Sequence, residues 1–182
     1  MCKLASSVCY LAGPIDFSDD LGVSFRKKLI LTAKHKGLGI KFLDPTDKLE
    51  GLQADVGDEQ SIINDYRKKR SWNKLSALMK KIVRVDLRQI DLADFVIVFI
   101  DTQIHMCGSY HELVEADRQK KPVLTIIKQG KENCPSWLFG TIDHNLMFSS
   151  IEECVEYLYK VDQELITLDD RWVLFREQLA SI

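Results

Sequence analysis

The sequence predicts an α/β fold in which helices cover both faces of a parallel sheet. Short apolar runs alternate along the chain with longer segments whose apolar residues recur every three or four positions, which is typical of strands joined by crossover helices. The runs 95–100 and 122–127 are rich in β-branched residues and barely alternate with polar ones, as expected of strands buried on both faces. We therefore expect a doubly wound, flavodoxin- or Rossmann-like sheet of about five strands in three α/β/α layers.

The remaining strands are weaker in the sequence. We expect them at 8–12, at 39–43, where Asp44–Pro45 ends the run, and at 146–148. Helical periodicity fills the gaps between strands, and Ser or Asp residues that can cap a helix precede each helical segment. The helices expected from this pattern lie at about 21–33, 109–116, 151–161 and 165–182, the last packing on the body or on a second subunit.

Two regions depart from the strand–helix alternation. Residues 46–60 are polar and contain two glycines, which predicts a loop that covers a site. Residues 62–82 hold seven Lys and Arg residues in a helical pattern, so we expect a helical insertion at about 58–82. We favour a solvated helix face for these charges over a surface that binds an anion or a partner.

Length and composition exclude several classes of protein. The 182 residues make one domain, 1–182, with 46% apolar and 29% charged residues. A net charge of -2 argues against binding a nucleic acid polymer. The longest apolar run is far shorter than the ~20 residues of a membrane span, and we recognise no signal peptide. Five cysteines without CxxC spacing indicate a reducing, cytoplasmic location.

Ligands of open parallel sheets bind beyond the carboxyl ends of the strands. Three polar loops follow predicted strands there, at 12–16, 101–112 and 128–135. They contain no GxGxxG, GxxxxGK[ST] or GxSxG motif, which argues against dinucleotide, P-loop and serine hydrolase chemistry. His105, Cys107 and His111 are three possible metal ligands without a zinc spacing, so we expect no metal. For Cys107 an inert buried thiol is favoured over a nucleophile.

Glu112 has two interpretations at this stage. As an ionised carboxylate in the first turn of a helix, it could attack a sugar carbon or stabilise an oxocarbenium ion. Ser109–Glu112 is also a capping box, as is Ser150–Glu153, and a capping Glu has no chemistry. The residues alone favour the cap.

A group of aspartates precedes the central strand. On a helix, Asp86 shares a face with Ile90, whereas Asp91 is turned about 100° further round. Asp94 is expected to cap or anchor the strand. Asp86 could protonate a leaving group only if the fold brings it near Glu112.

Taken together, these segments resemble the nucleoside 2-deoxyribosyltransferase family, including relatives that hydrolyse nucleoside 5'-monophosphates. The matching segments span residues 8–150 but omit 62–82. They are Tyr10–Pro14, Asp86–Asp94, Gly108–Leu113 with Ala116 and Lys121–Val123, and the pair Asn133 and Trp137.

The resemblance implies Glu112 as the nucleophile on the anomeric carbon, Asp86 as the residue that handles the proton of the departing base, and Tyr10 as the residue that orients Glu112. It also implies that Asn133 reaches the sugar's 5' end from another subunit, so that a homo-oligomer shares its active sites. No cofactor is implied. The other residues expected to bind substrate are Gly13, Pro14, Asp16, Asp101, Gly108 and Ser109.

The function expected from the resemblance is cleavage of the N-glycosidic bond of 2'-deoxynucleosides through a covalent glycosyl–Glu112 intermediate. A free nucleobase would then accept the deoxyribosyl group. Many transferases carry an aspartate at the position of Met106, which keeps 5'-monophosphate hydrolysis open, with Ser109, Arg26 or Arg84 on the phosphate. Two further alternatives are a nucleotide-binding sensor without turnover and an interaction module that works through helix 62–82.

Overall fold

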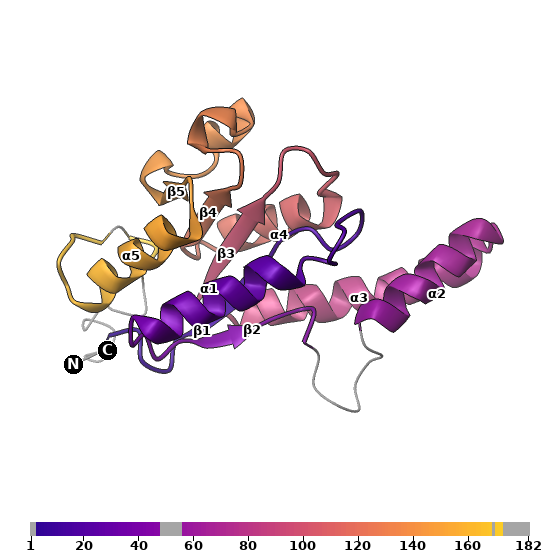
Figure 1. The fold of residues 1–182 in the computed structure, drawn as a ribbon, viewed down its shortest axis with the longest axis horizontal. Coiled ribbons are helices and arrows are strands. Elements are labelled where there is room, and N and C mark those ends of the chain that lie inside the picture. The colour runs from indigo at the N-terminus through magenta and orange to yellow at the C-terminus, as the bar shows by residue number, and fades with distance from the viewer. Residues whose placement is uncertain (1–2, 48–55, 169, 173–182) are drawn as a thin grey trace.

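The computed structural model describes residues 3–47, 56–168 and 170–172 and confirms the predicted fold class. Five parallel strands form one sheet in the order β2-β1-β3-β4-β5 (Figure 1). This order reverses its direction of growth beside β1, so a ligand crevice is expected between the carboxyl ends of β1 and β3. The strands are β1 Val8–Ala12, β2 Lys41–Leu43, β3 Phe95–Ile100, β4 Val123–Ile127 and β5 Met147–Phe148.

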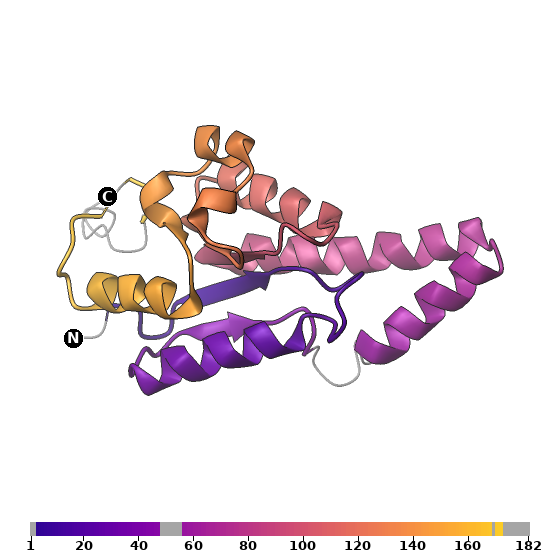
Figure 2. The same ribbon diagram turned by 45° about the horizontal axis from the view of Figure 1, so that its top comes forward.

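Helices cover both faces of the sheet, which gives three layers (Figures 1 and 2). On one face lie α1 (Val23–His35) and α5 (Ile151–Asp162), and on the other lie α3 (Trp72–Leu92) and α4 (Cys107–Arg118). Alternate strand residues enter the two resulting cores. The first core takes Cys9, Leu11, Phe95, Ile97, Leu124 and Ile126, and the second takes Tyr10, Ala12, Val96, Val98 and Val123.

The helical insertion differs from the prediction. It consists of two helices, α2 (Val56–Lys68) and α3, joined by a turn in which Arg70 has a left-handed φ of 52°. Residues 82–86 include no glycine or proline that would break a helix. Helix α3 therefore continues through the aspartate segment and ends at Leu92, just before β3. The hairpin of α2 and α3 extends beyond the sheet (Figure 2). The predicted loop 46–60 is shorter, because α2 begins at Val56, and 48–55 lie outside the described residues.

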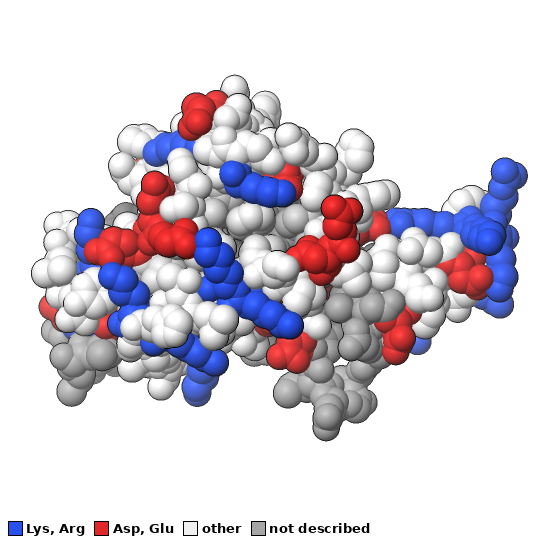
Figure 3. Space-filling view, in the orientation of Figure 1, with Lys and Arg blue, Asp and Glu red and all other residues white. Residues whose placement is uncertain are grey.

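Six of the seven basic residues of 62–82 are exposed, and the exception is Arg67. Basic side chains gather at the outer end of the hairpin (Figure 3). This exposure agrees with a solvated helix face for the six, and the choice between that and a binding surface stays a prediction. Arg67 instead points back to the body of the protein, as described below.

The predicted C-terminal helix does not begin at Leu165. Glu164 has a left-handed φ of 57° and ends α5, and residues 165–168 and 170–172 are not helical. Trp172 is buried against Phe95 and Tyr157, with ring centroids 5.5 and 6.4 Å away. The chain leaves the helical path because this indole fills the core above β3. Residues 173–182 of the predicted helix lie outside the described residues. In the part of the chain that is described, no helix is long and apolar enough to cross a membrane.

Candidate active site

A cavity of about 390 Å³ lies at the carboxyl ends of β1 and β3. Its walls are the loop after β1, the loop after β3 with the start of α4, and the inner side of the α2–α3 hairpin. The cavity brings together most of the residues that the sequence singled out. Those that line it are Gly13, Pro14, Asp16, Asp86, Gly108, Ser109 and Glu112.

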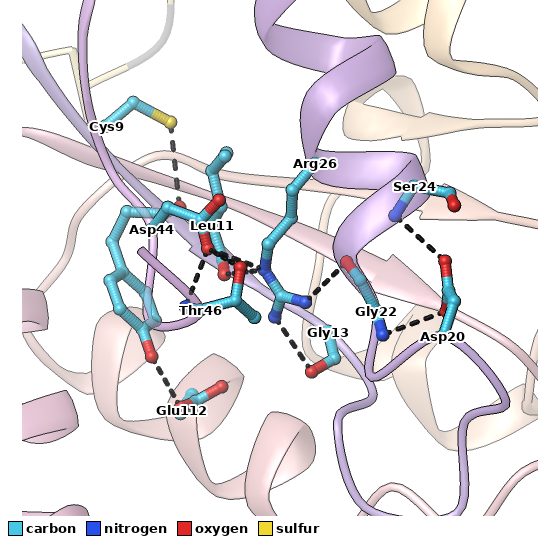
Figure 4. A network of polar contacts seen from close by, with 11 residues as sticks. Cys9, Leu11, Gly13, Asp20, Gly22, Ser24, Arg26, Asp44, Thr46 and Glu112 are labelled. Atoms are coloured by element: carbon cyan, nitrogen blue, oxygen red, sulfur yellow. Dashed lines mark hydrogen bonds and ion pairs between the residues drawn. The ribbon is translucent and has the colours of Figure 1, made fainter. Parts of the chain in front are cut away.

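Glu112 projects from α4 toward β1. The hydroxyl of Tyr10, which is fully buried on β1, donates a hydrogen bond of 2.7 Å to Glu112 Oε1 (Figure 4). Burial raises the pKa of Tyr10 well above its usual value, so this hydroxyl stays protonated and remains a donor. The predicted role of Tyr10 in orienting Glu112 agrees with this contact.

Burial also raises the pKa of Glu112, to about 8. The hydrogen bond from Tyr10 and the charge of Arg26 lower this pKa, and the nearby charge of Asp86 raises it. At neutral pH the Glu112 carboxyl group is therefore mostly protonated. A group with this pKa gains or loses its proton in response to a modest change of charge in the cavity.

The capping interpretation of Glu112 is wrong. Helix α4 begins at Cys107, two residues before Ser109. The N-cap residue that precedes it is Met106, whose side chain makes no capping hydrogen bond. Glu112 thus lies beyond the first turn, where the backbone N–H groups are already bonded within the helix. The same motif at Ser150 is a real cap, because Ser150 Oγ accepts the N–H of Glu153 at 3.1 Å.

Asp86 reaches the cavity because α3 packs against α4 and passes over β1. The condition set by the sequence is met, since its charge acts on Glu112. The neighbouring aspartates do other work. Asp94 Oδ2 accepts the N–H of Val8 at 2.7 Å and anchors β1 to β3, as predicted. Asp91 lies at the surface with Arg88, at 3.4 Å.

Asp16 also lines the cavity, but its carboxylate is bound to α2. Arg67 donates to both of its oxygens, at 3.0 and 2.6 Å, and Gln60 donates to Oδ1 at 3.0 Å. These bonds lower the pKa of Asp16. The guanidinium of Arg67 lies 5.4 Å from the ring centroid of Phe17, whose edge faces His105. Asp16 thus fastens the hairpin over the cavity, and its predicted contact with substrate stays a prediction.

The hairpin supplies site residues that the sequence did not reveal. Besides Gln60 and Arg67, the apolar side chains of α2 and α3 form one wall of the cavity, namely Ile63, Met79, Ile82 and Val83. The only signal in the sequence was the helical pattern of 62–82, whose basic residues drew attention away from its apolar face.

Besides the buried Tyr10, two predicted site residues, Asp101 and Asn133, do not line the cavity. The Asp101 carboxylate accepts hydrogen bonds from Lys128 at 2.7 Å and from the N–H of Gln103 at 3.0 Å, and so supports the loop after β3. Asn133 donates to the backbone oxygen of Gln129 at 2.6 Å. Its expected contact with a neighbouring subunit stays a prediction.

Arg26 and Arg84 do not offer a phosphate site. Arg26 is completely buried and bonded to backbone oxygens, while Arg84 is exposed and does not line the cavity. Cys107 is exposed at the start of α4, so its predicted burial is wrong. His105, Cys107 and His111 all border the cavity, yet among the described residues no three such side chains are placed to hold a metal ion.

Solved structures share this fold. A 2-deoxyribosyltransferase from Bacillus psychrosaccharolyticus is similar with a TM-score of 0.56 and 15% identity, over 83% of this chain and 92% of that one. A 2-desoxiribosyltransferase from Leishmania mexicana has a TM-score of 0.51 and 20% identity, over 85% of this chain and 97% of that one. A conserved protein from Enterococcus faecalis V583 has a TM-score of 0.51 and 17% identity, over 86% of this chain and 99% of that one. No protein-family model and no curated protein matches the sequence. The chain therefore has the fold of the 2-deoxyribosyltransferases.

Proposed function

We propose that this protein is an enzyme that cleaves the N-glycosidic bond of 2'-deoxynucleosides and transfers the deoxyribosyl group to another nucleobase. The observation that carries the proposal is the partly buried Glu112 carboxyl group, which accepts a hydrogen bond from Tyr10 and borders a cavity that Asp86 also lines. The fold shared with 2-deoxyribosyltransferases supports it.

The four cysteines of the described residues are free thiols, which supports a cytoplasmic location.

In the first step, the ionised carboxylate of Glu112 attacks the anomeric carbon. A bond forms between carbon and carboxylate oxygen while the carbon–nitrogen bond breaks, and the base leaves with a proton from Asp86. Tyr10 holds Oε1, which leaves Oε2 for the carbon. In the second step, a nitrogen of the incoming base attacks the same carbon, Asp86 takes up the released proton, and Glu112 leaves as a carboxylate.

The raised pKa of Glu112 suits this chemistry. A carboxylate in an apolar site is poorly solvated and is stabilised by the positive charge that develops on the sugar. The protonated form, which prevails below this pKa, cannot attack.

The pH dependence of the reaction follows from this pKa. Because the ionised fraction of Glu112 falls about tenfold per pH unit below its pKa, we expect kcat/KM for a base that leaves without a proton from Asp86 to rise with pH up to about 8. Tyr10→Phe removes a hydrogen bond that lowers the pKa, so the rise should move to higher pH. A pH–rate profile of both proteins measures this. An acid limb near the ordinary glutamate value of 4.5 would contradict it.

A second candidate is hydrolysis of 2'-deoxynucleoside 5'-monophosphates. It is favoured by the start of α4, where Gly108 and Ser109 border the cavity and the backbone N–H groups of a first turn can bind a phosphate. The buried side chain of Met106 stands where many transferases have an aspartate. In this variant of the reaction, water replaces the second base.

The test is product analysis. Purified protein is incubated with deoxynucleosides and their 5'-monophosphates, with and without a second base, and the products are separated by chromatography. A new nucleoside that forms only with acceptor supports transfer, and free base without acceptor supports hydrolysis. Binding without any product would overturn both proposals in favour of a sensor. Glu115→Gln, on the same helix but outside the cavity, is the control for Glu112→Gln.

The ion pair between Asp16 and Arg67, which we call the clamp, holds the α2–α3 hairpin over the cavity. It is expected to affect substrate binding. An ion pair of this exposure contributes up to about 1 kcal/mol, so Arg67→Ala should raise KM roughly fivefold with little change in kcat. Steady-state kinetics at two salt concentrations measure this, because salt weakens the clamp only in the wild type. Lys69→Ala is the control, since its ion pair joins Asp65 of α2 to the residue that directly follows this helix and does not reach the loops around the cavity. Equal effects of the two substitutions would contradict the role of the clamp.

A further inference from the structure

A completely buried guanidinium lies behind the cavity wall. Arg26, on the first turn of α1, donates to Gly22 O at 2.9 Å, Gly13 O at 3.1 Å and Leu11 O at 3.3 Å (Figure 4). It also stacks on Phe25, 4.5 Å from the ring centroid. These contacts tie the carboxyl end of β1 to the start of α1. They fix the backbone on both sides of Ala12, at the end of the strand that carries Tyr10.

The charge of Arg26 is only partly neutralised. Its carboxylate partner, Asp44 at the end of β2, has Oδ1 3.4 Å from Arg26 Nε. The same oxygen accepts the N–H and the hydroxyl of Thr46, at 2.8 and 2.7 Å. Burying a cation is unfavourable unless nearby groups compensate it. Here one shared carboxylate oxygen and three carbonyls do so, which leaves a positive field that reaches Glu112.

We propose that Arg26 is a positioning residue for the nucleophile: it fixes the end of β1 that presents Tyr10 to Glu112, and its buried charge steadies the negative charge on Glu112. Asp44 limits this effect by partly neutralising the guanidinium. The consequence for catalysis rests on the proposed function, whereas the effect on the ionisation of Glu112 does not.

The electrostatics of the site agree with this geometry. The charge of Arg26 lowers the pKa of Glu112, against burial and the charge of Asp86, which raise it. The charge of Arg26 likewise lowers the pKa of Tyr10. The titratable and charged groups around Glu112 come from each element that borders the cavity. They are Tyr10 of β1, Arg26 of α1, Asp86 of α3, Cys107 and His111 of α4, Glu59 and Arg67 of α2, and Asp16 and His105 of the loops.

Two substitutions should move the pKa of Glu112 in opposite directions. Arg26→Gln removes the positive charge, so the pKa should rise by about half a unit or more. Asp44→Asn keeps the size of the side chain and leaves the guanidinium less neutralised, so the pKa should fall by a similar amount. The pKa is obtained from the pH dependence of the unfolding free energy of each protein, compared with the same protein carrying Glu112→Gln. The acid limb of kcat/KM is the second readout.

Opposite shifts in the two variants support the proposal, and shifts in the same direction or none overturn it. If Arg26→Gln does not fold, Asp44→Asn and Arg26→Lys carry the test. Lys keeps the charge but cannot bind three carbonyls in the same way. In Arg26→Lys the pKa of Glu112 should therefore stay close to its wild-type value, while the free energy of unfolding should fall. Opposite shifts in a protein that releases no base would refute the proposed function but not this inference. Normal turnover without the shifts would refute the inference alone.

Discussion

Glu112→Gln is expected to reduce base release by at least about 10³-fold, because the amide cannot form the covalent intermediate that lowers the barrier. The amide has the same shape and can still accept the hydrogen bond of Tyr10, so substrate binding should change little. Turnover of each deoxynucleoside by the variant measures the effect. Glu115→Gln should retain wild-type turnover, and a Glu112→Gln variant with comparable activity would remove Glu112 from the mechanism.

The same substitution should stabilise the protein. The pKa of Glu112 is raised from 4.5 in the unfolded chain to about 8 in the fold, so between these pH values the folded protein binds more protons. Its stability therefore falls as pH rises through this window. Gln does not titrate, so the advantage of the variant should grow from pH 5 to pH 8, to roughly 2–5 kcal/mol. Denaturant unfolding at several pH values measures it. An advantage that does not vary with pH would contradict the raised pKa.

Asp86→Asn is expected to reduce turnover by about 10²–10⁴-fold, the usual contribution of a general acid. The loss should depend on the leaving group. A base that departs readily without a proton needs Asp86 little, so its cleavage should be slowed least. Rates for a series of deoxynucleosides that differ in the basicity of the base test this.

If Asp86→Asn has the unfolding free energy and the KM of the wild type, the cavity is intact. An equal loss for every leaving group would mean that Asp86 acts on the charge of Glu112 and not on the base. The removal of a negative charge should at the same time lower the pKa of Glu112, which the pH–rate profile detects.

The sheet could be predicted because its signal is local. β3 and β4 are buried on both faces, and each presents an almost continuous apolar run in the sequence. The short β2 and β5 were found with less exact ends, since three and two paired residues leave little pattern. The predicted start of the C-terminal helix at Leu165 was wrong because the contact of Trp172 with the core overrides the local helical pattern.

The sheet topology located only the site residues that follow strands, whereas Asp86, which precedes β3, came from the family resemblance. Gly13 and Gly108 lie in the loops at the carboxyl ends of β1 and β3, as the topology requires. Whether Glu112 was a cap or a cavity residue depended on where α4 begins, which the sequence did not define. Gln60 and Arg67 reach the cavity because the hairpin folds back over it, a tertiary effect without a local signature. The burial of Arg26 was equally invisible, since charged residues are mostly exposed.

The most direct measurement is the mass of the protein itself during the reaction. A deoxynucleoside whose intermediate breaks down slowly is mixed with the protein without an acceptor, the reaction is quenched in acid, and intact and peptide masses are recorded. The account predicts an added mass of one deoxyribosyl group on the peptide that contains Glu112, absent from Glu112→Gln and chased off by a second base. Base release without any adduct on that peptide, under conditions in which turnover is limited by the second step, would contradict it.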